Sequence, residues 1–118
     1  MGKTFEDLEV WRRGRLLAVE VCRELRECGD WGIRNQITRS AVSVPSNVAE
    51  GAERNSPNEF ALFAGYAKGS LGELRTQLMI ASDLGYIPAE AARRLVDETR
   101  ELSRMLHALI RSIRPPST

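Results

Sequence analysis

The residues with the clearest potential for chemistry form a basic stripe near the carboxyl end of the chain. The stripe recurs at intervals of three and four residues and contains one acid: Arg93, Asp97, Arg100, Arg104, His107, Arg111 and Arg114. At 3.6 residues per turn, this spacing places them on one side of a helix about 30 Å long. A row of cations of that length can follow a phosphate backbone, so the pattern indicates a binding surface for RNA or DNA.

The same charges also fit a solvated helix face that binds nothing. Glu90 and Arg94 have the spacing of an ordinary i,i+4 ion pair, and Arg111 and Arg114 complement the negative end of a helix dipole. The segment has no aromatic residue on which single-stranded bases could stack. Two hypotheses therefore stay open: a nucleic-acid-binding module, and a protein scaffold or adaptor with no nucleic-acid role.

The residue types needed for catalysis or metal binding are sparse. The chain has one histidine, His107, and two cysteines, Cys22 and Cys28. A di-iron bundle needs two Glu-x-x-His pairs, and these three residues would form a zinc site without any short ligand spacing such as C-x-x-C. As a base for a nucleophile, His107 would lie on the side opposite the leucine seam, and no phosphate-binding loop is present. We expect no catalytic residue, no metal and no cofactor.

Composition favours a single soluble domain. The chain has 118 residues, of which 42% are hydrophobic and 28% charged, and its formal net charge of +1 selects no partner. No apolar run approaches the roughly 20 residues of a bilayer span, and residues 1–10 lack the apolar core of a secretory signal. Cys22 and Cys28 are too far apart on one helix for a disulfide. We expect a cytoplasmic protein with no membrane partner.

Hydrophobic periodicity predicts four helices and no strands in one domain of residues 1–118. The helices span about 5–28, 31–53, 57–84 and 88–113. Ser56, followed by Pro57 and Glu59, is typical of a helix start, and Gly85 is typical of a helix end. The last helix carries a seam at a/d spacing: Leu95, Thr99, Leu102, Leu106, Leu109 and Ile113. Short connections favour an all-α, antiparallel up-down four-helix bundle.

Residues 40–51 place a proline inside the second predicted helix. Pro45 removes a backbone hydrogen bond, which costs about 3 kcal/mol in an isolated helix, and it predicts a kink. Ser43 and Asn47 carry polar groups that can satisfy the freed backbone positions. The proline therefore indicates a specialised packing site in this helix.

Asn47 and Glu50 lie one helical turn apart beside Pro45, and Arg54 follows four residues after Glu50. This arrangement allows a small ligand site. Polar networks of this kind more often hold a structure in register, so we expect Glu50 to pair with Arg54, Arg39 or a neighbouring helix.

Three glycines on the third predicted helix, Gly65, Gly69 and Gly72, are spaced at i, i+4 and i+7 and form a glycine stripe. Each costs about 1 kcal/mol relative to alanine in mid-helix. Together with small residues on the second helix, including Gly51, the stripe predicts a joint where a backbone or a large side chain approaches closely. A leucine at position 69 is then expected to clash and disrupt the bundle.

Longer motifs carry a resemblance to a known family. Residues 39–51 are RSAVSVPSNVAEG, residues 69–78 are GSLGELRTQL, and residues 83–87 are DLGYI. With LEVW at residues 8–11, these motifs resemble the four-helix-bundle proteins encoded in intervening sequences of bacterial 23S ribosomal RNA genes. The resemblance covers about residues 5–113 and implies an up-down bundle that assembles into a ring-like homopentamer.

The same family includes the accessory proteins of diversity-generating retroelements, which are similar in fold, form pentamers and bind nucleic acid together with a reverse transcriptase. The resemblance therefore implies a homo-oligomer, RNA or DNA as partner, and a reverse transcriptase if the gene lies in a retroelement. Apolar residues outside the predicted seams, such as Leu62, Tyr66 and Val96, also favour an oligomer larger than a dimer. The sequence thus predicts a non-enzymatic oligomeric binding module.

Overall fold

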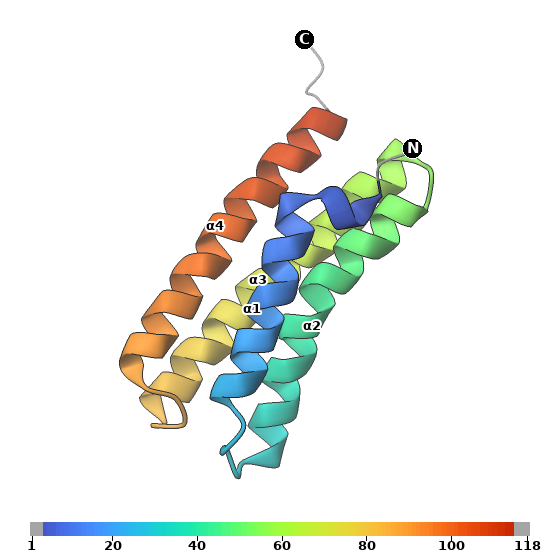
Figure 1. The fold of residues 1–118 in the computed structure, drawn as a ribbon. Helices are drawn as coiled ribbons and strands as arrows, with labels where there is room; N and C mark the ends of the chain where they lie inside the picture. Colours follow the sequence, from blue (N-terminus) through green and yellow to red (C-terminus); the bar gives the residue numbers. More distant parts are fainter. Residues whose placement is uncertain (1–3, 115–118) are drawn as a thin grey trace.

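The structure, a computed structural model, describes residues 4–114. Its elements are a short 3-10 helix and four α-helices: η1 (Phe5–Asp7), α1 (Glu9–Glu24), α2 (Trp31–Glu53), α3 (Pro57–Asp83) and α4 (Ala89–Ile113). Figure 1 shows consecutive helices running in opposite directions, with η1 and the end of α4 at the same end of the molecule. Residues 4–114 contain no strand, so the all-α fold class is confirmed.

The core lies between the four helices, because α3 packs against α2 and α4, and α1 packs against α2 and, less extensively, α4. Leucines dominate the fully buried side chains, among them Leu71, Leu74, Leu102 and Leu106. The a/d seam of α4 therefore faces the core as predicted. Val96 is only 6% exposed, so the expectation that it lies outside the core was wrong.

The first helix is shorter than the predicted 5–28. Thr4 caps η1 instead: its hydroxyl accepts from the backbone N–H of Glu6, and its own N–H donates to Asp7 at 3.0 Å. Leu8 is extended, with φ −77° and ψ 126°, and its side chain packs against the core. This contact competes with a continuous helix and separates η1 from α1, which ends at Glu24.

The start signals of α3 act as predicted. The Ser56 hydroxyl accepts a hydrogen bond from the N–H of Glu59 at 3.3 Å, and Pro57 is the first helical residue. Gly85 has a φ of +78°, the left-handed conformation that glycine adopts at low cost after a helix. Pro115 and Pro116, which also follow a helix in the sequence, lie outside the described residues.

Pro45 is buried inside α2, which continues without interruption from Trp31 to Glu53. The Ser43 hydroxyl donates to the carbonyl oxygen of Ser40 at 2.7 Å, and the Asn47 amide donates to that of Ser43 at 2.8 Å. Neither acceptor is the carbonyl of Ala41, the group that Pro45 leaves without a helical donor, so these side chains do not satisfy the freed position as the sequence predicted. The facing position on α1 is Gly14, where a Cβ would lie 3.7 Å from the Pro45 ring. The kink itself stays a prediction.

The tight joint of the bundle lies at Gly51. A Cβ there would lie 2.7 Å from the Cβ of Phe63, closer than packed carbons approach, and 3.3 Å from the backbone oxygen of Phe60. Gly51 therefore lets α2 and α3 meet closely. The packing joint predicted at the glycine stripe, in contrast, is wrong within the chain, because a Cβ on Gly65, Gly69 or Gly72 would meet nothing within 4 Å.

Two hydrogen bonds to Asp30, which we call the polar clasp, connect two turns at the end of the bundle opposite η1. The Tyr86 hydroxyl donates to Asp30 at 2.9 Å, and the other carboxylate oxygen accepts from the N–H of Ile33 at the start of α2. The backbone bond from Ile33 and the hydroxyl of Tyr86 lower the pKa of Asp30 below its ordinary value. The clasp therefore depends on an ionised carboxylate.

We expect Tyr86→Phe to lower the stability of the fold at pH 7, and this loss to shrink in acid. Because the pKa of Asp30 is lower in the folded chain, its stabilisation is present above its ordinary pKa and is lost as pH falls through the folded value. Urea unfolding of both proteins at pH 7 and at about pH 3 measures this. A deficit of equal size at both pH values would mean that the ionised carboxylate is not the partner that matters.

Candidate nucleic-acid interface

The basic stripe of α4 is exposed along its length: Arg93, Arg100, Arg104, His107, Arg111 and Arg114 all have accessible side chains. The stripe leans towards α3, because Nδ1 of His107 lies 3.4 Å from Nζ of Lys68. The side chain of Arg114 reaches the carbonyl oxygen of Asn58, at the start of α3, at 2.9 Å. The predicted residues thus share one side of the molecule, and Lys68 joins them.

Lys68 was not predicted from the sequence, although a signal for it existed. In an antiparallel helical hairpin, residues equally distant from the connecting turn lie opposite each other. The turn between α3 and α4 is centred near residue 87, which places Lys68 opposite His107 and Arg75 opposite Thr99. Both contacts occur, the second as a 2.9 Å hydrogen bond from Nε of Arg75 to the threonine hydroxyl.

Ion pairs offset the positive charge in the middle of the stripe but not at its ends. Arg100 pairs with Asp97 at 3.1 Å, and Arg104 pairs with Glu101 at 2.7 Å. The hydrogen bond from Arg104 lowers the pKa of Glu101, so this carboxylate stays ionised and offsets the charge of Arg104. Arg93 at the start of the stripe and Arg111 towards its end form no ion pair with any residue that the structure describes. The uncompensated positive charge therefore lies at the two ends of the stripe, and Lys68 adds to it at the carboxyl-terminal end.

Glu50 forms a structural pair rather than part of a ligand site. It lies 3.0 Å from Arg54, which also reaches Glu59 of α3 at 3.4 Å and stacks over the ring of Phe63. The Asn47 amide points to the backbone of its own helix. This arrangement links the end of α2 to α3 beside the Gly51 joint, which is the role that the sequence favoured.

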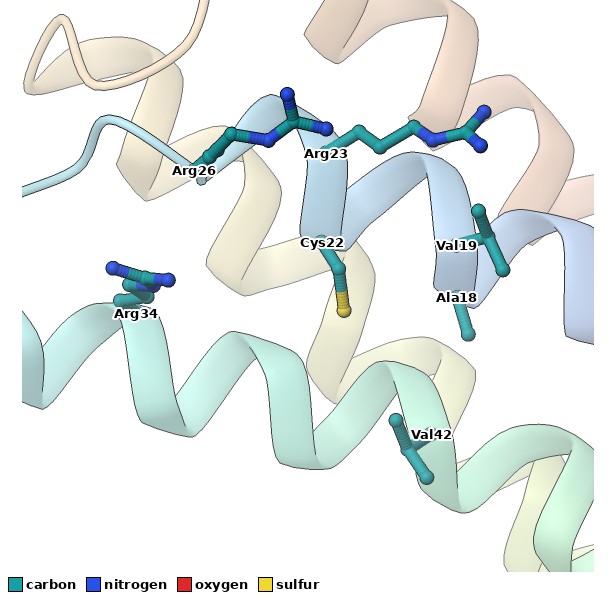
Figure 2. A pocket seen from close by; sticks show the side chains of 7 residues that line it. All are labelled: Ala18, Val19, Cys22, Arg23, Arg26, Arg34 and Val42. Atoms are coloured by element: carbon teal, nitrogen blue, oxygen red, sulfur yellow. The ribbon is translucent and has the colours of Figure 1, made fainter.

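A second basic surface was not predicted at all. A groove of about 390 Å³ runs between α1 and α2, and we call it the arginine groove; it is lined by Ala18, Val19, Cys22, Arg23, Arg26, Arg34 and Val42. Figure 2 shows Arg26 and Arg34 towards one end and the aliphatic side chains towards the other, with the thiol of Cys22 pointing towards α2. The three arginines make no ion pair within residues 4–114. The periodicity of α1 placed Arg23 outside the core but could not show which helix it borders.

Metal-ligating side chains are not gathered at any point in the described part of the chain. Residues 4–114 contain no group of three or more histidine, cysteine or acidic side chains placed to hold a metal. Both cysteines are free, with Cys28 buried and Cys22 half-buried. None of the described helices combines the length and the apolar character that crossing a membrane requires.

Comparisons with known proteins identify a family from a sequence model and a fold from a solved structure. The family model of the 23S rRNA-intervening sequence protein matches residues 6–108. A crystal structure from Bacteroides thetaiotaomicron, of a protein of unknown function from the S23 ribosomal protein family, has a TM-score of 0.80 at 22% identity, covering 86% of this chain and 97% of that one. This likeness shows the fold. The comparison with curated proteins gives no match. Because the family model spans most of the chain, including the Pro45 and glycine-stripe motifs, the chain belongs to the 23S rRNA-intervening sequence protein family.

Proposed function

We propose that the protein is a non-enzymatic, oligomeric binding module that contacts RNA or DNA through the basic stripe of α4. One observation carries the proposal: six basic or titratable residues spaced along one helix are all exposed on the same side, and their carboxyl-terminal end is joined by Lys68. A phosphate backbone is the ligand that such a row of cations fits.

The composition of the stripe suggests how it would bind. Arginine and lysine contact phosphate oxygens without reading base identity, and α4 carries no aromatic side chain for stacking. The stripe therefore fits binding that depends on the nucleic-acid backbone and is nearly independent of base sequence. The uncompensated Arg111 should contribute more to such binding than Arg100, whose charge is shared with Asp97.

The outward side of α3 supports the oligomeric part of the proposal. Leu62, Tyr66 and Ile80 are 45%, 51% and 45% exposed, and the glycine stripe lies among them. Large apolar side chains gathered on one surface are typical of an interaction site. The glycines lower helix stability without permitting any close contact inside the chain. We therefore expect the helix that packs closely against them to belong to a second copy.

The family resemblance supplies the finer parts of the proposal. A ring-like homopentamer is the expected assembly, and the cytoplasm is the expected compartment. A reverse transcriptase would be a further partner if the gene lies in a retroelement. A pentameric ring would repeat the α4 stripe in every copy, which strengthens binding to a long nucleic acid through multiple contacts.

Removal of two cations from the stripe tests the nucleic-acid proposal. We expect Arg104→Gln with Arg111→Gln to weaken retention of RNA and DNA alike, while the fold stays intact because both side chains are exposed. Each lost phosphate contact should reduce the slope of log K against log[salt] by about one. Fluorescence anisotropy with labelled single-stranded and duplex oligonucleotides over a salt series measures both effects.

The matched control is Arg12→Gln with Arg39→Gln, which removes the same charge from exposed positions of α1 and α2. Binding by the control should stay near that of the wild type. Equal losses in both double variants would mean that net charge, not the stripe, governs binding. If the unmodified protein fails to bind RNA or DNA even near 50 mM salt, the alternative of a protein scaffold or adaptor is favoured.

A further inference from the structure

The arginine groove has two chemically distinct ends. Its aliphatic end is formed by Val19 of α1 and Val42 of α2, which are 40% and 46% exposed. Its basic end is formed by Arg26 and Arg34, seen on the left of Figure 2. No carboxylate of the described chain pairs with these guanidinium groups, so the groove lacks both an apolar cover and an anionic partner.

The outward side of α3 has the complementary chemistry, and we call it the α3 face; it comprises Leu62, Gly65, Tyr66, Gly69, Glu73 and Ile80. Its charged member is a carboxylate. The two basic residues of α3, Lys68 and Arg75, are half-buried and contact α4 instead. The α3 face therefore presents exposed apolar side chains and an anion, the two things that the arginine groove lacks.

The spacing of these features also matches. Val19 on α1 precedes Arg26, in the turn that follows α1, by seven residues, and on α3, Tyr66 precedes Glu73 by seven residues. The interval on α3 is two helical turns, about 10 Å, and the interval from Val19 follows α1 to Glu24 and continues two residues into the turn. With the two helices side by side in the same direction, the aromatic side chain meets the aliphatic end of the groove while the carboxylate meets its basic end. Gly69 lies between them, where its missing side chain lets the helices approach.

We infer that the arginine groove of one copy receives the α3 face of a second copy. This inference rests on the self-association proposed above and names the surfaces that carry it. Two different surfaces meet, so the contact is heterologous and leaves one free groove and one free α3 face on each pair. Such a contact adds copies until a ring closes.

A second copy fits the groove better than a nucleic acid does. Phosphates would satisfy the arginines, but the sugars of a nucleic-acid backbone carry oxygen on most of their carbons, so they cover Val19, Val42 and the floor of Ala18 and Cys22 less well than apolar side chains do. The α3 face supplies both kinds of group at the required separation. It belongs to the same chain, so it is present at the same concentration as the groove.

Charge reversal with rescue tests the inference. Arg26→Glu sets two carboxylates against each other in the contact, and Glu73→Arg sets two guanidinium groups against each other. Each variant alone is expected to raise the dissociation constant of the assembly at least tenfold, and the double variant is expected to restore assembly. Sedimentation equilibrium measures the oligomeric state, and circular dichroism confirms that each variant is folded. Arg12→Glu, on α1 outside the groove, is the matched control and should leave assembly unchanged.

The outcomes distinguish self-association of the protein from the specific contact between the arginine groove and the α3 face. A wild-type monomer at micromolar concentration overturns self-association and this inference with it. An assembled wild type whose single variants also assemble overturns the groove assignment alone. Single variants that dissociate without rescue by the double variant overturn the pairing of Arg26 with Glu73. If Arg26→Glu keeps the oligomer but loses binding to RNA, the occupant of the groove is a nucleic acid, and the inference is wrong.

Discussion

Gly51→Ala is expected to destabilise the bundle by about 1–3 kcal/mol, even though alanine is the better helix former by about 1 kcal/mol. The added methyl group would lie 2.7 Å from the Cβ of Phe63, an atom fixed to the α3 backbone, and 3.3 Å from the backbone oxygen of Phe60. Neither atom can move without shifting α3 itself. Urea unfolding at fixed protein concentration measures the loss.

The control for Gly51→Ala is Gly32→Ala, near the start of α2. Gly32 is exposed, and a Cβ there would meet only the Asp30 side chain at 3.7 Å, an ordinary contact. The control is therefore expected to keep or slightly raise stability. If Gly51→Ala behaves like the control, α2 and α3 have room to separate at this joint, and the close approach is not essential to the fold.

Gly69→Leu is expected to leave the chain folded and to abolish its assembly. Within the chain, a side chain at position 69 meets nothing within 4 Å, and leucine gives about 1 kcal/mol in helix propensity over glycine. On the α3 face, however, the leucine would project into the space that a second copy needs. Circular dichroism should show unchanged helix content, while sedimentation equilibrium should show a mass near the 13.2 kDa of one chain.

Gly69→Ala serves as the graded control for this variant, since a single methyl group adds much less bulk and should weaken assembly less. Loss of helix content in Gly69→Leu would instead support the clash within the bundle that the sequence suggested. An oligomer of unchanged size would show that the α3 face is free in the assembly.

Local signals in the sequence determined the elements of the fold. The range 31–53 predicted for the second helix is that of α2, and the capping residue Ser56 starts α3 where expected. The a/d spacing in α4 identified buried residues such as Leu102 and Leu106. These features depend on contacts within a few residues along one helix, so neighbouring residues are enough to specify them.

The sequence also determined most of the basic stripe, because residues three or four apart on a helix share a side whatever surrounds the helix. Its charge balance was harder to predict. The pairs of Arg100 with Asp97 and of Arg104 with Glu101 follow i,i+3 spacing, yet Asp97 also had Arg93 within reach, four residues before it. Only the folded arrangement selects among partners at similar sequence distance.

Tertiary structure alone decided what lies against each side of a helix. Gly51 and Gly69 look alike in sequence, yet the first lies against Phe63 of α3 and the second lies on an outward surface. The arginine groove likewise exists only because the fold brings Arg26, in the turn after α1, to the same groove as Arg34 of α2. Helical periodicity fixes the relative directions of side chains on one helix. The rotation of that helix against its neighbours is set by packing of the whole core, which no single segment encodes.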